Sequence, residues 1–211
     1  MKERPILFGG PMVRAILGGQ KTVTRRAVKF PLKDKATGCW LAGNEIGPVE
    51  VRDNSPFGQP GDRLYVRETF MDLRGAGVEH RPDPDGPLQR YAYGADTRPG
   101  SHGDEARKDF GLKWKPSIHM PRAACRILLE ITDVRVERLQ DISDGQAEAE
   151  GIDLDQLADA QERYDMVADH NMTGRPTAVG QFAYLWESIN GAGAWDANPW
   201  VWVVEFKRVM P

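Results

Sequence analysis

The chain contains little cysteine and little histidine. Of its 211 residues only two are cysteines, Cys39 and Cys125, and four are histidines. The cysteines do not form a CxxC-type pair and the histidines are scattered, so neither a disulfide scaffold nor a zinc site is expected. We expect both cysteines to be reduced, and we expect no metal and no other cofactor.

Long hydrophobic runs are also missing. No apolar stretch approaches the ~20 residues of a membrane-spanning helix, and residues 1–5 lack the hydrophobic region of a signal peptide. The sequence therefore predicts a cytoplasmic protein without membrane contact. The length and the 40% hydrophobic content favour a single domain with insertions. The sequence does not set the oligomeric state, although a monomer is favoured.

An overall positive charge is absent as well. The formal net charge is −3, which argues against a uniformly basic nucleic-acid binder. The charge is uneven, because residues 141–169 hold ten acids and one base and the rest of the chain carries 27 bases and 21 acids. A local basic surface outside the acidic segment is still compatible with phosphate binding.

Hydrophobic periodicity predicts a mixed α+β fold. The alternation of apolar and polar residues indicates strands, and spacing of three and four residues indicates helices. Residues 31–60 mix Pro, Gly, Asn and Asp with short apolar pieces, which predicts a loop or a hairpin around residues 39–41. The strands are expected near residues 22–28, 63–70, 125–137 and 200–208. The helices are expected near residues 11–18, 143–150 and 179–190, the second opened by a capping box of Ser143 and Gln146.

Two long segments do not fit this frame and are expected to be insertions, at about residues 74–112 and 153–178. The first is rich in Gly, Pro, Asp and Arg, with residues 91–93 as its one possible strand, and is expected to be either a functional lid or disordered. The second contains an acidic helix, near residues 153–169, with Leu154, Leu157 and Ala158 facing inward.

The residues best suited to chemistry lie in positions 19–26, Gly-Gln-Lys-Thr-Val-Thr-Arg-Arg. Lys21 and Thr24 suit a base and a nucleophile, and Arg26 suits a phosphate or a carbonyl oxygen. Composition alone favours a solvated, basic start of a strand. Regular alternation would place Lys21 and Thr24 on opposite faces, so a shared pocket requires the strand to begin after Lys21.

The order of these residues resembles a known family signature. Gly19, Lys21, Thr24 and Arg26 match the pattern Gly-x-Lys-x-x-(Glu or Thr)-x-Arg of the ASCH family, which belongs to the PUA-like proteins. Residues 60–68 and 200–206 resemble a turn-then-strand element and the closing strand of that family. The resemblance implies a small PUA-like β-barrel with helices packed around it and a long loop insertion.

One branch of this family has threonine at the position of Thr24 and hydrolyses N4-acetylcytidine to cytidine and acetate. Its acidic catalytic residue lies in a pattern Ala-Glu-x-Glu, which here is residues 147–150, so Glu150 is the match and Glu148 a decoy. The resemblance implies an amidohydrolase acting on N4-acetylcytidine or a related acylated nucleoside. Its catalytic residues would be Lys21, Thr24 and Glu150.

Elementary chemistry supports these roles. A threonine hydroxyl needs a base near it, and lysine serves as one only if desolvation or a neighbouring cation lowers its pKa toward ~7 to 8. Arg25 or Arg26 would supply that cation. A carboxylate favours protonated lysine, so Glu150 is expected to orient the amine or to carry the proton to the departing cytosine amine.

Four residues are candidates for substrate binding. They are Arg26, Glu68, Trp114 and His119, and the last two lie in residues 113–122, where bases alternate with ring side chains. Such alternation suits stacking on a base beside a phosphate, and it equally suits a rigid loop covering the core. The alternative function is an RNA-binding, possibly RNA-cleaving, PUA-like module using Arg26, Lys113, Trp114 and Lys115. The partner is therefore a modified pyrimidine nucleoside or RNA.

Overall fold

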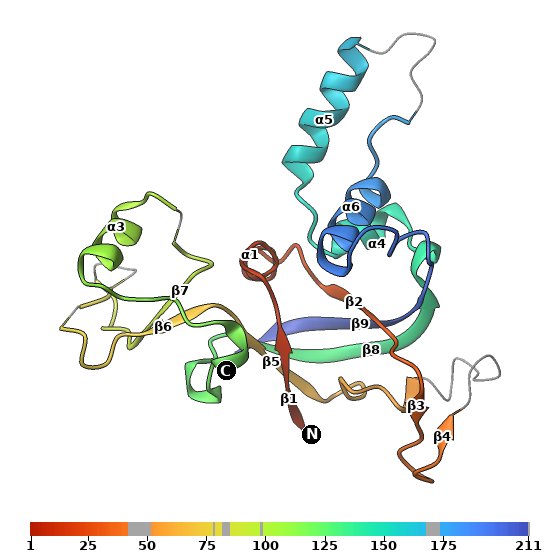
Figure 1. The fold of residues 1–211 in the computed structure, drawn as a ribbon, viewed down its shortest axis with the longest axis horizontal. Helices are drawn as coiled ribbons and strands as arrows, with labels where there is room; N and C mark the ends of the chain where they lie inside the picture. The colour runs from red at the N-terminus through yellow and green to blue at the C-terminus, as the bar shows by residue number, and fades with distance from the viewer. Residues whose placement is uncertain (42–51, 78, 82–84, 98, 168–173, 211) are drawn as a thin grey trace.

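The computed structural model describes residues 1–41, 52–77, 79–81, 85–97, 99–167 and 174–210. These residues form a mixed α+β structure, as the sequence predicts, with a five-stranded sheet at its centre and two separate two-stranded hairpins (Figure 1). The strands are β1 (Glu3–Leu7), β2 (Val23–Ala27), β3 (Leu32–Lys33), β4 (Trp40–Leu41), β5 (Arg63–Arg67), β6 (Phe70–Asp72), β7 (Tyr91–Tyr93), β8 (Leu128–Arg138) and β9 (Trp200–Val209).

The central sheet has the order β1-β5-β8-β9-β2. β1 and β5 are parallel, and the other neighbours are antiparallel. The longest pairing joins β8 and β9 from Leu128↔Val209 to Arg138↔Trp200, with a register shift between Ile131 and Asp133. The strand expected near residues 125–137 is therefore one bulged strand, β8. The four predicted strands are confirmed, whereas pairing of the N-terminal residues as β1 was not expected.

Both faces of the sheet are buried. Trp202, Val204 and Phe206 lie in one hydrophobic cluster, with Ile6, Phe8 and Leu64. The intervening Val201 and Val203 lie in a second cluster, against helix residues such as Phe182 and Trp186. Successive strand residues point to opposite faces of the sheet. One face of β9 packs against a helical layer and the other against the curled sheet and α1, which explains why β9 is largely apolar.

The sheet is open among the described residues, because β1 and β2 are its edges and no strand pairing joins them. A side chain spans this gap. Nη2 of Arg26 in β2 donates a hydrogen bond to the carbonyl oxygen of Leu7 in β1 at 2.8 Å. The two edges of the sheet therefore curl toward each other and are linked by a guanidinium.

The helices are α1 (Gly10–Leu17), α3 (His102–Asp109), α4 (Asp144–Ala149), α5 (Leu154–Val167) and α6 (Ala178–Asn190). α1, α4 and α6 confirm the three predicted helices, and α4 begins with the predicted capping box of Ser143 and Gln146. None of the helices in the described part of the chain is long and apolar enough to cross a membrane.

The predicted inward face of α5 is only partly correct, and the apolar stripe of α6 is likewise only partly buried. In α5, Leu157 is buried, but Leu154 is 41% exposed and Ala158 is also exposed. In α6, Phe182 and Trp186 are buried, whereas Ile189 is 64% exposed. α5 extends away from the sheet (Figure 1), so little of the chain is available to cover its apolar side chains.

The first expected insertion contains secondary structure. Tyr91–Tyr93 form β7, as predicted, and pair with β6 beside the sheet. α3 was not predicted, because only a strand was identified in this Gly- and Pro-rich segment. Around Cys39, where a loop or a hairpin was expected, β3 and β4 form a hairpin. The interpretation of the whole chain as one domain with insertions stays a prediction.

Candidate functional site

Lys21 lies in the turn between α1 and β2. Gly19 after α1 has φ +78°, a conformation that glycine adopts without strain. The backbone N–H groups of Gln20 and Lys21 both donate to the carbonyl oxygen of Ala15, at 2.9 and 3.0 Å. β2 then begins at Val23, so the strand starts after Lys21, which is the condition for a pocket shared with Thr24.

The Lys21 amine is buried and has three acceptors. Nζ lies 2.7 Å from Oε2 of Glu150, 2.7 Å from the Glu150 carbonyl oxygen and 2.8 Å from the Val23 carbonyl oxygen. The Lys21 and Glu150 side chains are only 2% and 4% exposed. Three acceptors match the three N–H bonds of an ammonium ion, so this geometry is that of a protonated lysine paired with a carboxylate.

Glu150 lies at the C-terminal end of α4. It is the C-cap residue of this helix, and the carbonyl oxygen of Ala149 accepts a 2.9 Å hydrogen bond from the N–H of Thr22. Gly151 follows with φ +82°, and a Cβ there would lie 2.8 Å from Cβ of Ala15 and 2.9 Å from Cβ of Lys21. Only glycine permits this approach. Glu148 is exposed, so Glu150 is the carboxylate that meets Lys21.

Arg25 holds the other side of the Glu150 carboxylate. Its Nη1 donates to Oε1 of Glu150 at 3.3 Å, and its Nη2 donates to Oε1 of Gln146 at 2.9 Å and to Oε2 of Glu137 at 3.3 Å. The Arg25 side chain is fully buried. Gln146 and Glu150 are four residues apart and therefore lie on one face of α4, so one guanidinium binds a residue of the first turn and the C-cap residue of this short helix.

The pKa of Lys21 is lowered from its ordinary value. Burial is the largest cause because it penalises the charged ammonium, and Glu150 opposes it, by charge and by hydrogen bonding. The positive charges of Arg26 and Arg25 lower this pKa further. Desolvation and neighbouring cations are the two effects expected to lower the pKa of a lysine that acts as a base.

Arg26 lies against the same region from the other face of β2. Its guanidinium carbon is 5.2 Å from the centre of the Phe8 ring, and Lys21 Nζ is 5.6 Å from the same centre. Burial also lowers the pKa of Arg26, with Glu150 acting in the opposite direction. Lys21 and Arg26 therefore both lie beside Phe8, while Arg25 approaches Glu150 from the opposite face of β2.

Thr24 is buried, at 3% exposure, and pairs with Val204 of β9. It shares its face of β2 with Arg26, whereas Val23 and Arg25 occupy the other face. Within the described residues its hydroxyl makes no hydrogen bond, and none joins it to Lys21. Its proximity to the amine, which the motif implies, stays a prediction.

Glu68 belongs to a separate cluster. It is 1% exposed, and both of its carboxylate oxygens accept hydrogen bonds from Arg126, each at 2.9 Å. Arg126 also donates to Asp96 and stacks on Tyr93, with 3.9 Å between its guanidinium carbon and the ring centre. Burial raises the pKa of Glu68, and Arg126 opposes this change. Burial likewise raises the pKa of Tyr93 to about 12.

The two ring residues proposed for substrate stacking lie elsewhere. Trp114 is half-buried against Met71, Leu73 and Ala92, with Arg107 5.9 Å from its ring centre. His119 is exposed, in a 3₁₀ turn over Ser117–His119. In the described part of the chain, neither residue makes a hydrogen bond, ion pair or ring contact with Lys21, Thr24 or Glu150.

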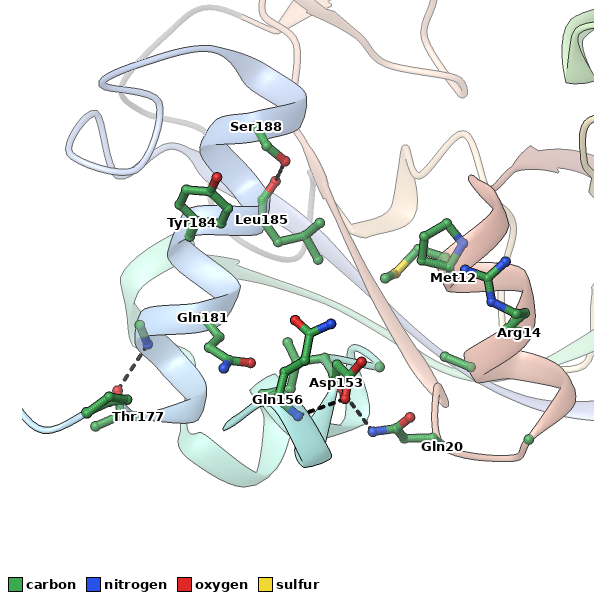
Figure 2. Close-up of a pocket in the computed structure, with 17 residues that line it drawn as sticks. Met12, Arg14, Gln20, Asp153, Gln156, Thr177, Gln181, Tyr184, Leu185 and Ser188 are labelled. Carbon is green, nitrogen blue, oxygen red and sulfur yellow. Dashed lines mark hydrogen bonds between the residues drawn. The ribbon is translucent and has the colours of Figure 1, made fainter. Parts of the chain in front are cut away.

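A groove of about 810 Å³ borders this site (Figure 2). Gln20 and Gly151, the chain neighbours of Lys21 and Glu150, form part of its wall. Among the described residues, no group of three or more His, Cys, Asp or Glu side chains is placed to hold a metal ion. Comparisons of the chain with protein-family models, with curated proteins and with solved structures found no match in any of the three.

Proposed function

We propose that this chain is an ASCH-type amidohydrolase that removes the acetyl group from N4-acetylcytidine or a related acylated pyrimidine nucleoside. The observation that carries the proposal is the buried pair of Lys21 and Glu150, with 2.7 Å between Nζ and Oε2. These residues are 129 positions apart, and the motif selects Glu150 over Glu148. The curled sheet, whose edges Arg26 links to Leu7, supports the finer proposal of a PUA-like barrel.

The proposed reaction begins from the ion pair. Lys21 must lose a proton before it acts as a base, and Oε2 of Glu150 is close enough to accept it. Burial favours loss of this proton from Lys21, because it penalises the charged ammonium. The neutral amine then turns from the Val23 carbonyl toward the Thr24 hydroxyl.

The first chemical step transfers the acetyl group to Thr24. Lys21 takes the hydroxyl proton as Oγ1 attacks the acetyl carbon, and the bond from this carbon to N4 of cytosine breaks. Protonated Glu150 gives its proton to the departing nitrogen, so cytidine leaves with an intact amine. The products of this half-reaction are cytidine, acetyl-Thr24 and the restored Lys21–Glu150 ion pair.

Water completes the cycle by the same proton movements. Glu150 again takes a proton from Lys21, and the neutral amine removes a proton from water as its oxygen attacks the acetyl carbon. Glu150 returns its proton to Oγ1 of Thr24 as the ester bond breaks. The second half-reaction releases acetic acid, which ionises to acetate.

The RNA-binding alternative has weaker support. Arg26 was expected on a shared basic surface with Lys113, Trp114 and Lys115, but its guanidinium donates to Leu7 and its pKa is lowered by burial. Trp114 packs in a hydrophobic cluster with Met71. Lys113 and Lys115 are exposed, so they are the members of this group that present charge to solvent.

The decisive experiment incubates the purified chain with N4-acetylcytidine and, separately, with RNA containing the same modified base. Mass spectrometry of the products should show cytidine and acetate from at least one substrate, and Lys21→Ala should abolish their formation. Absence of turnover of either substrate, combined with RNA binding that weakens steeply with salt, would replace the hydrolase with the RNA-binding alternative.

A further inference from the structure

The groove beside the site has two apolar sides and a polar base (Figure 2). Met12 of α1 and Leu185 of α6 point into it from opposite sides. Met12 packs on one hydrophobic cluster and Leu185 on the other. Its volume of about 810 Å³ is within the range of about 300–1,000 Å³ that holds small ligands.

Two carboxamides converge at the base of the groove. Gln156 of α5 and Gln181 of α6 direct their side-chain amides into the space between α6 and α1 (Figure 2). Within the described part of the chain these two amide groups make no hydrogen bond. The other glutamine of the groove, Gln20, is occupied, because its Nε2 donates to the carbonyl oxygen of Ile152 at 2.5 Å.

The charges of the groove do not favour an anion. Among its described lining residues Arg14 is the single cation, and its Nη1 donates to the carbonyl oxygen of Ala95 at 3.1 Å. Asp153 is the single acid, and its Oδ1 accepts the N–H of Gln156 at 3.0 Å. Arg14 and Asp153 therefore leave the lining without net charge, so it carries no excess positive charge for a phosphate.

We infer that this groove binds an uncharged nucleobase or nucleoside, held between Met12 and Leu185 and read by the carboxamides of Gln156 and Gln181. A carboxamide has a donor and an acceptor side by side, which pairs with the adjacent donor and acceptor on the edge of a base. The apolar sides suit the faces of the ring. Gln156 comes from the predicted insertion of residues 153–178, so this segment supplies part of the recognition.

The site goes beyond the proposed function and does not depend on it. Cβ of Lys21 lies behind Gly151, where a Cβ on the glycine would be 2.9 Å from it, and the amine points away to Val23 and Glu150. A ligand in the groove therefore contacts the wall behind the ion pair. Its binding should persist in the Lys21→Ala variant.

The test is isothermal titration calorimetry with cytidine, uridine, adenosine and guanosine, each compared with its 5′-monophosphate. At least one nucleoside should bind, and its monophosphate should bind about tenfold more weakly or worse. Gln156→Ala and Gln181→Ala should each weaken binding about tenfold, the effect of one lost hydrogen bond. Gln89→Ala, which removes an exposed glutamine outside the groove, is the matched control and should leave the affinity unchanged.

Three results would overturn the inference. They are no binding of any nucleoside at millimolar concentration, equal affinity in the Gln156→Ala/Gln181→Ala double variant, and loss of binding in Lys21→Ala. The last result would place the ligand at the ion pair instead of the groove. Thermal unfolding of each variant confirms that it is folded, and failure of deacetylation alone leaves this test unaffected.

Discussion

Nη1 of Arg25 lies 3.3 Å from Oε1 of Glu150, on the carboxylate oxygen that Lys21 does not use. The buried Glu150 carboxylate therefore pairs with two cations. The Arg25 guanidinium also donates a hydrogen bond to Gln146, in the first turn of α4. Arg25 thereby orients Glu150 toward Lys21 and places a second positive charge near the amine. The proposed mechanism can therefore be tested separately at Lys21, Glu150 and Arg25.

The proposed catalytic roles predict non-additive losses. Lys21→Ala, Thr24→Ala and the double variant should each reduce deacetylation by a similar factor, about 10²–10⁴, because a base and its nucleophile act as a unit. Steady-state rates with N4-acetylcytidine provide the measurement. Glu150→Ala should also be impaired, whereas Glu148→Ala, which removes an exposed carboxylate of the same helix, should retain activity. A Lys21→Ala variant with most of the activity would contradict the mechanism.

Arg25→Met should shift the pH dependence of the reaction. Burial, Arg26 and Arg25 lower the pKa of Lys21, while Glu150 raises it, so removing Arg25 should raise this pKa and move the rising limb of the rate to higher pH. Arg25→Lys should restore part of the shift because it keeps the charge. Competitive chemical labelling of Lys21 at increasing pH, read by mass spectrometry, measures the same change without activity.

The Arg25→Met variant should also be less stable. Its side chain is fully buried, and its loss leaves Oε1 of Glu150 without this donor. Breaking a buried charge pair costs about 3 kcal/mol, so urea unfolding should show a decrease of that order. Arg175→Met removes an exposed pair with Asp165 and should change the free energy of unfolding by less than about 1 kcal/mol. Equal effects of the two substitutions would argue against the role of Arg25.

Lys21 should make the stability depend on alkaline pH. Burial lowers its pKa in the folded state below the ordinary value of 10.5, so between these two values the unfolded state binds more protons. The free energy of unfolding of the wild type should therefore rise, relative to Lys21→Met, as the pH increases through this window. Urea unfolding of both proteins at several pH values tests the sign. A relative decrease would mean that Glu150 dominates and that the Lys21 pKa is raised.

Two glycines should respond differently to alanine. Gly19 and Gly151 both have positive φ, but a Cβ on Gly19 meets no atom within 4 Å, whereas one on Gly151 meets Ala15 and Lys21 below 3 Å. Gly19→Ala should cost about 1–2 kcal/mol from backbone strain. Gly151→Ala should cost more and should also reduce deacetylation, because Glu150 must move away from Lys21. Thermal unfolding and rate measurements on both variants separate the effect of backbone strain from the effect of moving Glu150.

Several features of the fold follow from local sequence. The alternation in residues 200–208 predicts β9, and the pair of Ser143 and Gln146 predicts the start of α4. These signals are readable because strand and helix periods and capping depend on residues close together in the chain. The Lys21–Glu150 contact was foreseen only through the family resemblance, since no local rule connects positions so far apart.

Helical periodicity identified the apolar faces of the helices, but it did not show which elements pack against those faces. Leu154 and Ile189 fit apolar stripes and are nevertheless exposed, because burial requires a neighbouring element at that position. Trp114 has the character of a stacking residue, and the structure instead packs it against Met71 and Leu73. In each case, whether the side chain is covered depends on a chain segment that is distant in sequence.

The sequence by itself determined the mixed α+β composition and the main strands and helices, and it indicated the start of β2 as the candidate site. Only the tertiary structure decided that the sheet curls with Arg26 bonded to Leu7, that Arg25 shares Glu150 with Lys21, and that a groove forms beside Gly151. Periodicity and turn propensity are local, and they act between residues a few positions apart. Burial, desolvation and charge pairing depend on which distant segments meet, so they are set only when the chain is packed.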